Sequence, residues 1–262
     1  VAEIANFSKL QAGASPENII LTAGKIYAGD SAQKLIYGLD INNNLITSVS
    51  AGESGVNALK YPSLGKDNNV YYLGNGNVTR LNVSEGKIKN MPIDLKNGLG
   101  NIKTAANFNN KLYLVNSQEG QIYVYGRQGE NFGAPTPWLK EKTDLAATAD
   151  MDIDGSIYVM KNDGSILKYL KGAEENFSLM KVHPILANPT KITAKSESEY
   201  IYILEPADKR LIVYDKSGKF LSQYQFENLA DLKDFAVDEE KEIIYLLNGS
   251  SVYKIEAMRL GR

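Results

Sequence analysis

The residues best placed to do chemistry are three aspartates at alternating positions, Asp150, Asp152 and Asp154, followed at once by a glycine. Oxygen ligands at every second position before a glycine bend are typical of the start of a calcium-binding loop. The ninth and twelfth positions, which would complete such a loop, hold Tyr158 and Lys161 instead of carboxylates. We therefore favour a hairpin turn here and predict no metal site, with a calcium site on the three aspartates as the alternative.

The inventory of catalytic side chains is small. The chain of 262 residues has no cysteine and a single histidine, His183, so it lacks thiolate nucleophiles, cysteine-bound zinc, iron–sulfur clusters and any site that needs two imidazoles. It also lacks a Gly-x-Ser-x-Gly nucleophile elbow. We expect His183 and Trp138 to lie in linkers with packing or surface roles. The sequence thus predicts no catalytic residues and no cofactor, and a protein that is not an enzyme.

The elements that position these residues repeat about every 44 residues. An aliphatic residue followed by tyrosine recurs six times, and successive tyrosines are 44, 42, 45, 44 and 43 residues apart. Internal periods of this length are typical of propellers and repeat arrays. The six dyads are Ile26-Tyr27, Val70-Tyr71, Leu112-Tyr113, Ile157-Tyr158, Ile201-Tyr202 and Ile244-Tyr245.

Each repeat reads as four short antiparallel strands. A turn rich in Gly, Asn and Asp follows the dyad, and then comes an aliphatic residue with a large apolar residue three positions later, as in Ile166 and Tyr169. This pattern predicts a β-hairpin, and alternating segments such as 148–153 and 219–226 supply the two flanking strands. Because one four-stranded unit cannot bury both faces alone, we predict an all-β fold, a six-bladed β-propeller of four-stranded antiparallel blades.

The two ends of the chain are predicted to share the last blade. Seven residues follow Ile255, too few for a turn and a fourth strand, whereas residues 1–7 precede the first inner strand at the interval expected of an outer strand. We predict that this N-terminal strand completes the last blade and closes the propeller, which removes two exposed edges. Residues 1–262 then form a single domain. Since the chain begins with Val1 rather than Met, we expect it to come from a longer protein.

The fourth repeat has the most regular sequence. Residues 149–159 read Ala-Asp-Met-Asp-Ile-Asp-Gly-Ser-Ile-Tyr-Val, residues 162–169 read Asn-Asp-Gly-Ser-Ile-Leu-Lys-Tyr, and residues 192–215 follow the same pattern. In this form the chain resembles NHL-repeat and SMP-30-like propellers, which implies a six-bladed fold. The arginine that the family usually has before the third strand is kept at Arg210 alone, so the resemblance does not extend to the phosphate or RNA surface of some members.

Polar residues recur in the turns between the second and third strands of the repeats. In a propeller these turns gather around the mouth of the central channel, where converging polar groups bind a small polar molecule or an extended peptide. The alternative is that Asn and Asp serve here as turn formers. The six candidate ligand-binding residues are Asp30, Asn75, Asn116, Asn162, Asp208 and Asn248.

The leading prediction for function is a non-catalytic propeller that binds a ligand or another protein, as a sensor or scaffold domain of a larger bacterial protein. The alternative is a calcium-dependent lactonase-like hydrolase with its site at the mouth of the central channel, because the fold resembles that of gluconolactonase-like propellers. Glu17 lies about where that family has a metal-binding glutamate, although the Gly-Pro-Trp continuation of the family is absent after it. A purely structural spacer is the third possibility.

Charge and hydropathy limit the partners. The chain has 29 Lys and Arg against 31 Asp and Glu, a net charge of −2, so no attraction to nucleic acid is expected. No apolar run approaches the ~18 residues that span a bilayer, so we predict no membrane insertion. Cysteine avoidance with abundant Asn, Ser and Tyr is typical of domains on the extracytoplasmic side of a bacterial membrane, or reflects genome composition. We expect a monomeric domain whose partner is a protein or a small polar ligand.

Overall fold

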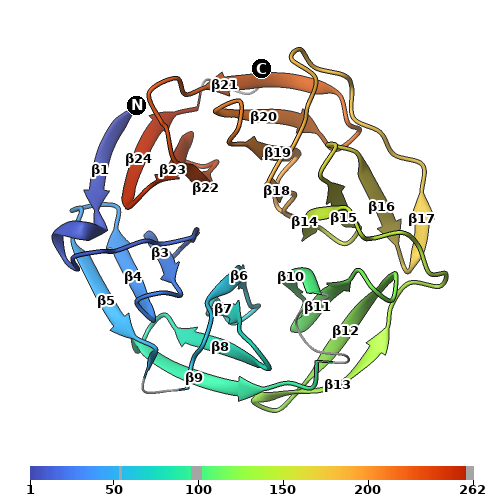
Figure 1. Ribbon diagram of the computed structural model, residues 1–262, viewed down its shortest axis with the longest axis horizontal. Helices are drawn as coiled ribbons and strands as arrows, with labels where there is room; N and C mark the ends of the chain where they lie inside the picture. The colour runs from blue at the N-terminus through green and yellow to red at the C-terminus, as the bar shows by residue number, and fades with distance from the viewer. Residues whose placement is uncertain (53–54, 96–101, 258–262) are drawn as a thin grey trace. The chain divides into compact units, whose positions relative to one another are not determined.

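The computed structural model describes residues 1–52, 55–95 and 102–257. Its strands form six separate four-stranded antiparallel sheets, one for each repeat of the sequence (Figure 1). This is an all-β propeller arrangement of six blades. It confirms the predicted fold class, and it confirms the resemblance to NHL-repeat and SMP-30-like propellers at the level of fold.

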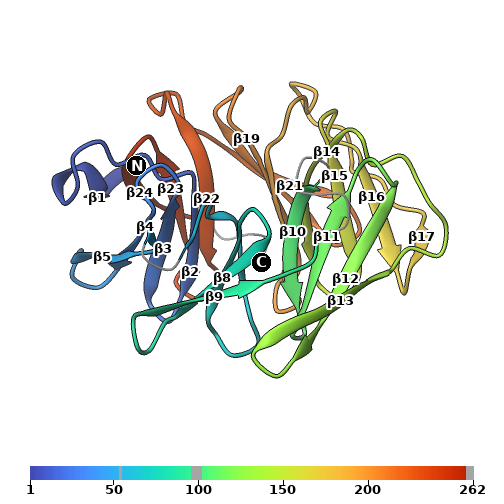
Figure 2. The same ribbon diagram turned by 60° about the horizontal axis from the view of Figure 1, so that its bottom comes forward.

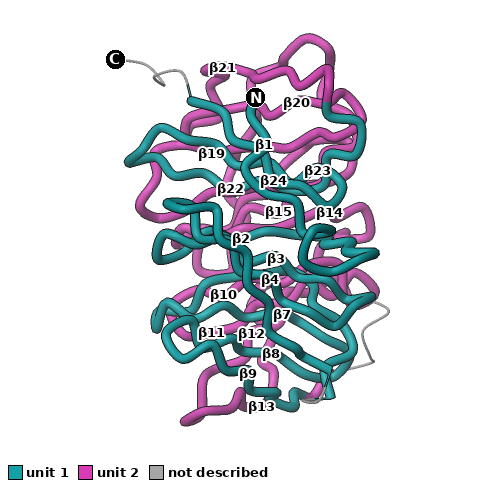
Figure 3. The backbone as a smooth tube through the Cα atoms, turned by 90° about the vertical axis from the view of Figure 1, so that its left-hand side faces the viewer, with its two compact units in different colours: residues 1–93, 229–260, 262 teal, residues 94–228, 261 magenta. Residues whose placement is uncertain are grey.

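The chain divides into two compact units (Figure 3). In the described chain the first unit comprises residues 1–93 and 229–257, and it holds three blades and a 3-10 turn. Blade 1 consists of β2 (Asn18–Thr22), β3 (Lys25–Asp30), β4 (Leu35–Asp40) and β5 (Ile46–Ser50). Blade 2 consists of β6 (Lys60–Leu64), β7 (Val70–Leu73), β8 (Asn77–Asn82) and β9 (Lys87–Pro92). Blade 6 consists of β22 (Leu232–Asp238), β23 (Ile243–Asn248), β24 (Ser251–Glu256) and β1 (Ala2–Asn6), after which η1 (Phe7–Lys9) forms the turn.

The second unit, residues 94–228, holds the other three blades. Blade 3 consists of β10 (Ile102–Phe108), β11 (Lys111–Asn116), β12 (Gln121–Gln128) and β13 (Asn131–Pro137), which lie side by side in Figure 2. Blade 4 consists of β14 (Thr148–Ile153), β15 (Ile157–Lys161), β16 (Ile166–Leu170) and β17 (Ala173–Glu175). Blade 5 consists of β18 (Lys191–Thr193), β19 (Tyr200–Glu205), β20 (Arg210–Asp215) and β21 (Phe220–Gln225).

Blade 6 is completed by the N-terminal strand, as predicted. Strand β1 pairs antiparallel with β24, from Ala2 opposite Lys254 to Asn6 opposite Ser251. The next residue, Phe7, is fully buried and stacks on Tyr37 of blade 1, with 4.8 Å between the ring centroids. The N-terminal segment therefore supplies the fourth strand of one blade and an aromatic contact to the next.

The hydrophobic core lies between neighbouring blades of each unit. All six repeat tyrosines are buried, which explains why the dyad recurs in every blade. In the first unit one cluster combines residues of blades 6 and 1 and another combines residues of blades 1 and 2. In the second unit the clusters combine blades 3 and 4, and blades 4 and 5. Within each unit, neighbouring blades thus bury the faces that they share.

None of the helical turns found in the described ranges has the length and apolar character of a membrane-spanning helix.

Candidate functional site

The first two aspartates of the candidate calcium loop join blade 4 to its neighbours. Asp150 accepts a hydrogen bond from the Thr104 hydroxyl of blade 3 at 2.7 Å and one from the amide of Ile192 in blade 5 at 3.0 Å. Asp152 accepts one from the amide of Ala194 at 2.7 Å. Because Asp150 and Asp152 are two residues apart, as are the amides that they bind, the two carboxylates stand in for main-chain carbonyls between the inner segments of blades 4 and 5.

A register shift in β14 accompanies this arrangement. The pairing of β14 with β15 shifts between Thr148 and Asp150, just before the first aspartate. Blade 6 has the same combination of register shift and aspartate. Its inner strand shifts register just before Asp234, and Asp234 accepts a hydrogen bond from the amide of Ile19 in blade 1 at 2.9 Å. The bulge and the carboxylate therefore form a recurring contact between blades rather than a feature of one loop.

Burial changes the protonation behaviour of Asp152. Burial raises the pKa of this carboxyl above its usual value, and the negative charge of Asp150 acts in the same direction. The amides of Ala194 and Ile153 oppose the shift, because they donate hydrogen bonds to the ionised form.

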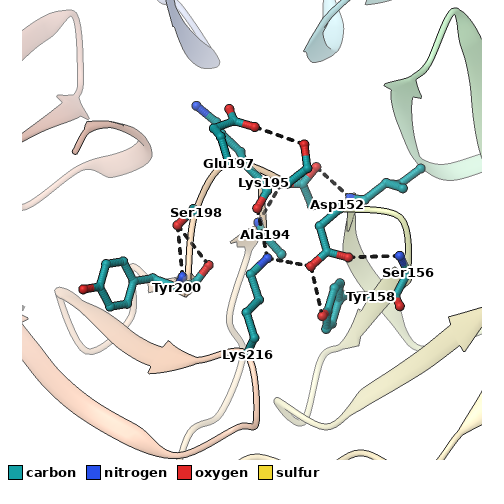
Figure 4. Close-up of polar contacts among 12 residues, drawn as sticks. Asp152, Ser156, Tyr158, Ala194, Lys195, Glu197, Ser198, Tyr200 and Lys216 are labelled. Atoms are coloured by element: carbon teal, nitrogen blue, oxygen red, sulfur yellow. Dashed lines mark hydrogen bonds and ion pairs between the residues drawn. The ribbon is translucent and has the colours of Figure 1, made fainter. Parts of the chain in front are cut away.

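The third aspartate, Asp154, binds side chains of its own blade and of blade 5. Figure 4 shows two of its partners, Tyr158 and Lys216. The Oδ2 of Asp154 accepts from the ammonium of Lys216 at 2.7 Å and from the hydroxyl of Tyr158 at 3.2 Å, and its Oδ1 accepts from the amide of Ser156 at 3.0 Å. The Lys216 ammonium also donates to the carbonyl of Lys195 at 3.0 Å. Both carboxylate oxygens of Asp154 are therefore engaged.

Two lysines flank the ring of Tyr158. The Nζ of Lys216 lies 5.5 Å and the Nζ of Lys168 lies 5.4 Å from the ring centroid, both within the range of a cation–π interaction. Lys216 pairs with Asp154, and Lys168 lies 3.5 Å from Glu175, so the positive charges are balanced. Burial, together with the nearby Asp154, raises the pKa of Tyr158, so the phenol stays neutral.

These contacts bear directly on the calcium alternative. The three aspartates bind different partners, and the cation next to Asp154 is the Lys216 ammonium. Over the ranges that the structure describes, no three His, Cys, Asp or Glu side chains are grouped so that they could hold a metal ion. Glu17 accepts a hydrogen bond from the Ser31 hydroxyl at 2.9 Å. As arranged, these carboxylates do not fit a calcium centre.

The six predicted turn residues are placed differently from one another. Asp30 and Asn116 are buried, Asn248 is half-buried, and Asn75, Asn162 and Asp208 are exposed. Within the described part of the chain, no two of the six share a hydrogen bond. All of them except Asp208 are bonded to their own turn or to a linker beside their blade.

Four of these residues form hydrogen bonds with linkers between blades. Asp30 accepts from the amide of Ser15 at 2.7 Å. Asn248 accepts from the amide of Asp231 at 2.8 Å. The main chains of Asn75 and Asn162 bond to linkers, the first to the side chain of Asn57 and the second to Ala147 and Asn188. Asn116 accepts from the amide of Glu119 at 3.1 Å within its own turn.

The sixth residue, Asp208, lies beside an ion pair that the sequence did not reveal. Arg210 and Glu205 have fully buried side chains, with Nε 2.6 Å from Oε2. Arg210 also donates to the carbonyl of Pro184 at 2.9 Å, and Glu205 accepts from the amide of Ala187 at 2.5 Å. Asp208 lies 3.5 Å from the same guanidinium. The pair thus fixes the linker that leads into blade 5.

In blade 3, the first residue of the third strand also binds a linker. Gln121, at the position equivalent to Arg210, accepts from the amide of Leu139 at 2.8 Å and donates to the carbonyl of the same residue at 3.2 Å. The arginine at this position is therefore a linker contact in this chain. Its presence at Arg210 was the available signal for the buried pair, whereas no motif pointed to Lys216 or Glu205.

Solved structures with this fold have varied roles. Virginiamycin B lyase from Staphylococcus aureus matches over 98% of this chain and 88% of its own at 12% identity, with a TM-score of 0.56. PorZ, an essential surface component of the type-IX secretion system of Porphyromonas gingivalis, matches over 98% of this chain and 38% of its own at 12% identity, with a TM-score of 0.60. Hydrazine synthase from Kuenenia stuttgartiensis matches over 94% and 96% at 8% identity, with a TM-score of 0.60. No protein-family model and no curated protein sequence matches the chain.

These similarities correct one prediction. The sequence led us to expect that the chain is not an enzyme, because its catalytic inventory is poor and its fold is a propeller. Two of the structures with the same fold are named as enzymes, a lyase and a synthase, so the exclusion was wrong. What the comparisons establish is the fold, a propeller whose known examples range from enzymes to a secretion component.

Proposed function

We propose that this chain is a protein-binding domain and that the linker between blades 4 and 5, residues 176–190, carries the contact surface. The linker exposes two large apolar side chains, Met180 at 57% and Ile185 at 74% of their full accessibility. A single exposed apolar residue is ordinary on a protein surface. Ile185 differs because the main chain that carries it is held by hydrogen bonds to a buried ion pair.

The observation that carries the proposal is the buried ion pair under this linker. The guanidinium of Arg210 donates to the carbonyls of Pro184 and Ile185, at 2.9 and 3.4 Å, and Glu205 holds the amide of Ala187. Burying two charges costs several kcal/mol per ion unless their hydrogen bonds are satisfied, so the pair depends on this linker and in turn fixes it.

An exposed apolar side chain on a main chain that is already fixed suits protein recognition. Little conformational entropy remains to be lost when it is bound, and preorganisation of this kind raises affinity. Large side chains that insert into a pocket of the partner dominate the binding free energy of most interfaces. Ile185 has these properties, and its neighbours Lys181 and His183 are exposed, as the polar rim of an interface requires.

The similarity to PorZ supports a place within a larger protein. This chain corresponds to 38% of that secretion-system surface component. We propose the same organisation here: one propeller domain of a larger bacterial surface protein, which presents the 176–190 linker to a partner.

The test is site-specific photo-crosslinking in cells that produce the protein. A photoreactive residue at position 185 should give a discrete cross-linked species, whereas the same residue at position 10 should not. Leu10 is the matched control, since it is 47% exposed but lies in the first unit. With the captured partner purified, Ile185→Ser should weaken binding by about 30-fold, as expected when a residue worth about 2 kcal/mol is truncated. Equal cross-linking at the two positions, or an unchanged affinity, would contradict the proposal.

A further inference from the structure

The outer strand of every blade has an open edge. Strands β1, β5, β9, β13, β17 and β21 each pair with one neighbour and end their sheet. An open edge exposes main-chain amides and carbonyls to which another strand can bind, and proteins protect such edges with charges, prolines, bulges or short strands.

Five of these six edges carry such protection. Strand β9 contains lysines, β13 contains prolines, β17 has three residues including glutamates, β21 has a register shift against β20, and β1 has both a register shift and a glutamate. The residues concerned are Lys87, Lys89, Pro92, Pro135, Pro137, Glu174, Glu175 and Glu3.

Strand β5 has none of these features. Its sequence, Ile-Thr-Ser-Val-Ser, contains no charge and no proline, and three of its five residues, Ile46, Thr47 and Val49, are β-branched and favour strands. It pairs with β4 from Ile46 opposite Leu39 to Ser50 opposite Leu35 with no register shift. Thr47, Ser48 and Ser50 are exposed. Of the outer strands that the structure describes, β5 is the one left unprotected.

We propose that β5 pairs antiparallel with β5 of a second copy of this chain, about a two-fold axis at Ser48. The two copies of blade 1 then form one continuous sheet of eight strands. This interaction lies in the first unit and is separate from the 176–190 linker.

The sequence of β5 fits its own copy. About a two-fold axis at Ser48, Ile46 lies opposite Ser50, Thr47 lies opposite Val49, and Ser48 lies opposite itself. No like charges meet, and the small residue at the centre allows close approach. On β9 or β17, by contrast, a second copy would bring lysines or glutamates of the same sign together, which is destabilising.

Cysteine cross-linking tests the geometry directly, because the chain contains no cysteine. Residues directly opposite in an antiparallel pair have Cβ atoms about 4.5–5.5 Å apart, close enough for a disulfide after a small adjustment. Ser48→Cys in the full chain should form a covalent dimer under mild oxidation. Thr136→Cys on the proline-containing edge of β13 is the matched control and should form no covalent dimer.

Introducing a charge at the same position provides a second test. By sedimentation, the unmodified chain should shift with concentration from 28.8 kDa toward twice that mass. Ser48→Lys and Ser48→Glu should each be monomeric alone, because like charges face each other, and a mixture of the two should restore the dimer. Ile185→Ser should dimerise normally, which separates this interaction from the proposed protein-binding surface.

The proposal is overturned by a chain that stays monomeric at every concentration, by a Ser48→Cys variant that cross-links no faster than Thr136→Cys, or by a dimer that survives Ser48→Lys. Protection of the β5 amides from hydrogen exchange only after another protein is added would assign the edge to that protein and would also overturn it.

Discussion

Three aspartate side chains of this protein accept hydrogen bonds of the kind that main-chain carbonyls accept within a sheet. Asp150, Asp152 and Asp234 accept hydrogen bonds from amides of a neighbouring blade, where no strand pairing reaches. A carboxylate that accepts such bonds is favoured in its ionised form, whereas burial disfavours that form. For Asp152 the balance between these two effects decides how the contact responds to pH.

For Asp152 burial prevails, and this gives a prediction about pH. Its pKa in the folded chain is raised above the ordinary 3.8, so its contribution to stability is fully present below that value and is lost as pH rises through the folded-state pKa. Asp152→Asn removes this dependence. The free energy of unfolding of the variant, measured in urea, should therefore increase relative to that of the unmodified chain as pH rises from 3.8 through the folded-state pKa of Asp152.

Asp215→Asn is the control, and its effect should have the opposite sign. Hydrogen bonds from Ser217, together with those from Lys219, lower the pKa of Asp215, so the unmodified chain gains stability as pH rises through this range. The Asp215→Asn variant should lose stability relative to it. The same direction of change in both variants would contradict the assignment for Asp152.

A second residue-scale prediction concerns Gly218. This glycine has φ +88°, and a Cβ added there would lie 2.3 Å from the carbonyl oxygen of Ser178 in the linker. Gly76 has nearly the same φ, +84°, and nothing within 4 Å. Gly76→Ala should cost about 1–2 kcal/mol from the left-handed backbone alone. Gly218→Ala should cost about 1–3 kcal/mol more because the linker must move. Equal losses in denaturant unfolding would show that the linker contact is unimportant.

At the scale of elements, the sequence predicted the strands well and their side-chain contacts poorly. The tyrosine dyads recur because every blade buries the same face, so their spacing gave the six blades and the strand supplied by residues 1–7. Turn residues carry no comparable constraint. Whether Asp30 faces solvent or fastens Ser15 depends on the path of the linker, which no local pattern encodes. Lys216 meets Asp154 across 62 residues, and no spacing rule connects them.

The closing strand gives the prediction at this scale. Deleting residues 1–9 removes β1 and Phe7, leaving the edge of β24 unpaired and a cavity against Tyr37. Loss of the Phe7 side chain alone should cost about 3–5 kcal/mol. The truncated chain should therefore melt at a markedly lower temperature in calorimetry. Removal of exposed Val1 alone is the control and should leave the melting temperature unchanged.

At the scale of the whole molecule, the first unit is built from both ends of the chain, and the second unit is the stretch between them. The first unit is therefore incomplete until strands β22, β23 and β24 have joined β1. We keep the sequence-based proposal that residues 1–262 act as one domain, although each unit has its own cores.

That proposal predicts a single unfolding transition. Calorimetric and van't Hoff enthalpies should agree, and probes placed in the two units should report the same midpoint. Trp138, in the second unit, supplies one fluorescence probe, and a tryptophan replacing Tyr37 in the first unit of a Trp138→Phe chain supplies the other. Two separate midpoints would show that the units unfold independently.

The pairing of β1 with β24 also has a mechanical consequence. Ala2 lies opposite Lys254 and Asn6 lies opposite Ser251, so the start of β1 and the end of β24 lie at the same end of the strand pair. A force that pulls the two chain ends apart acts across the pair rather than along it, and it loads one hydrogen-bonded pair at a time. The β1–β24 pair therefore unzips, and this needs a lower force than shearing the two strands past each other. Stretching the molecule would free the N-terminal segment first and leave the rest of blade 6 in place.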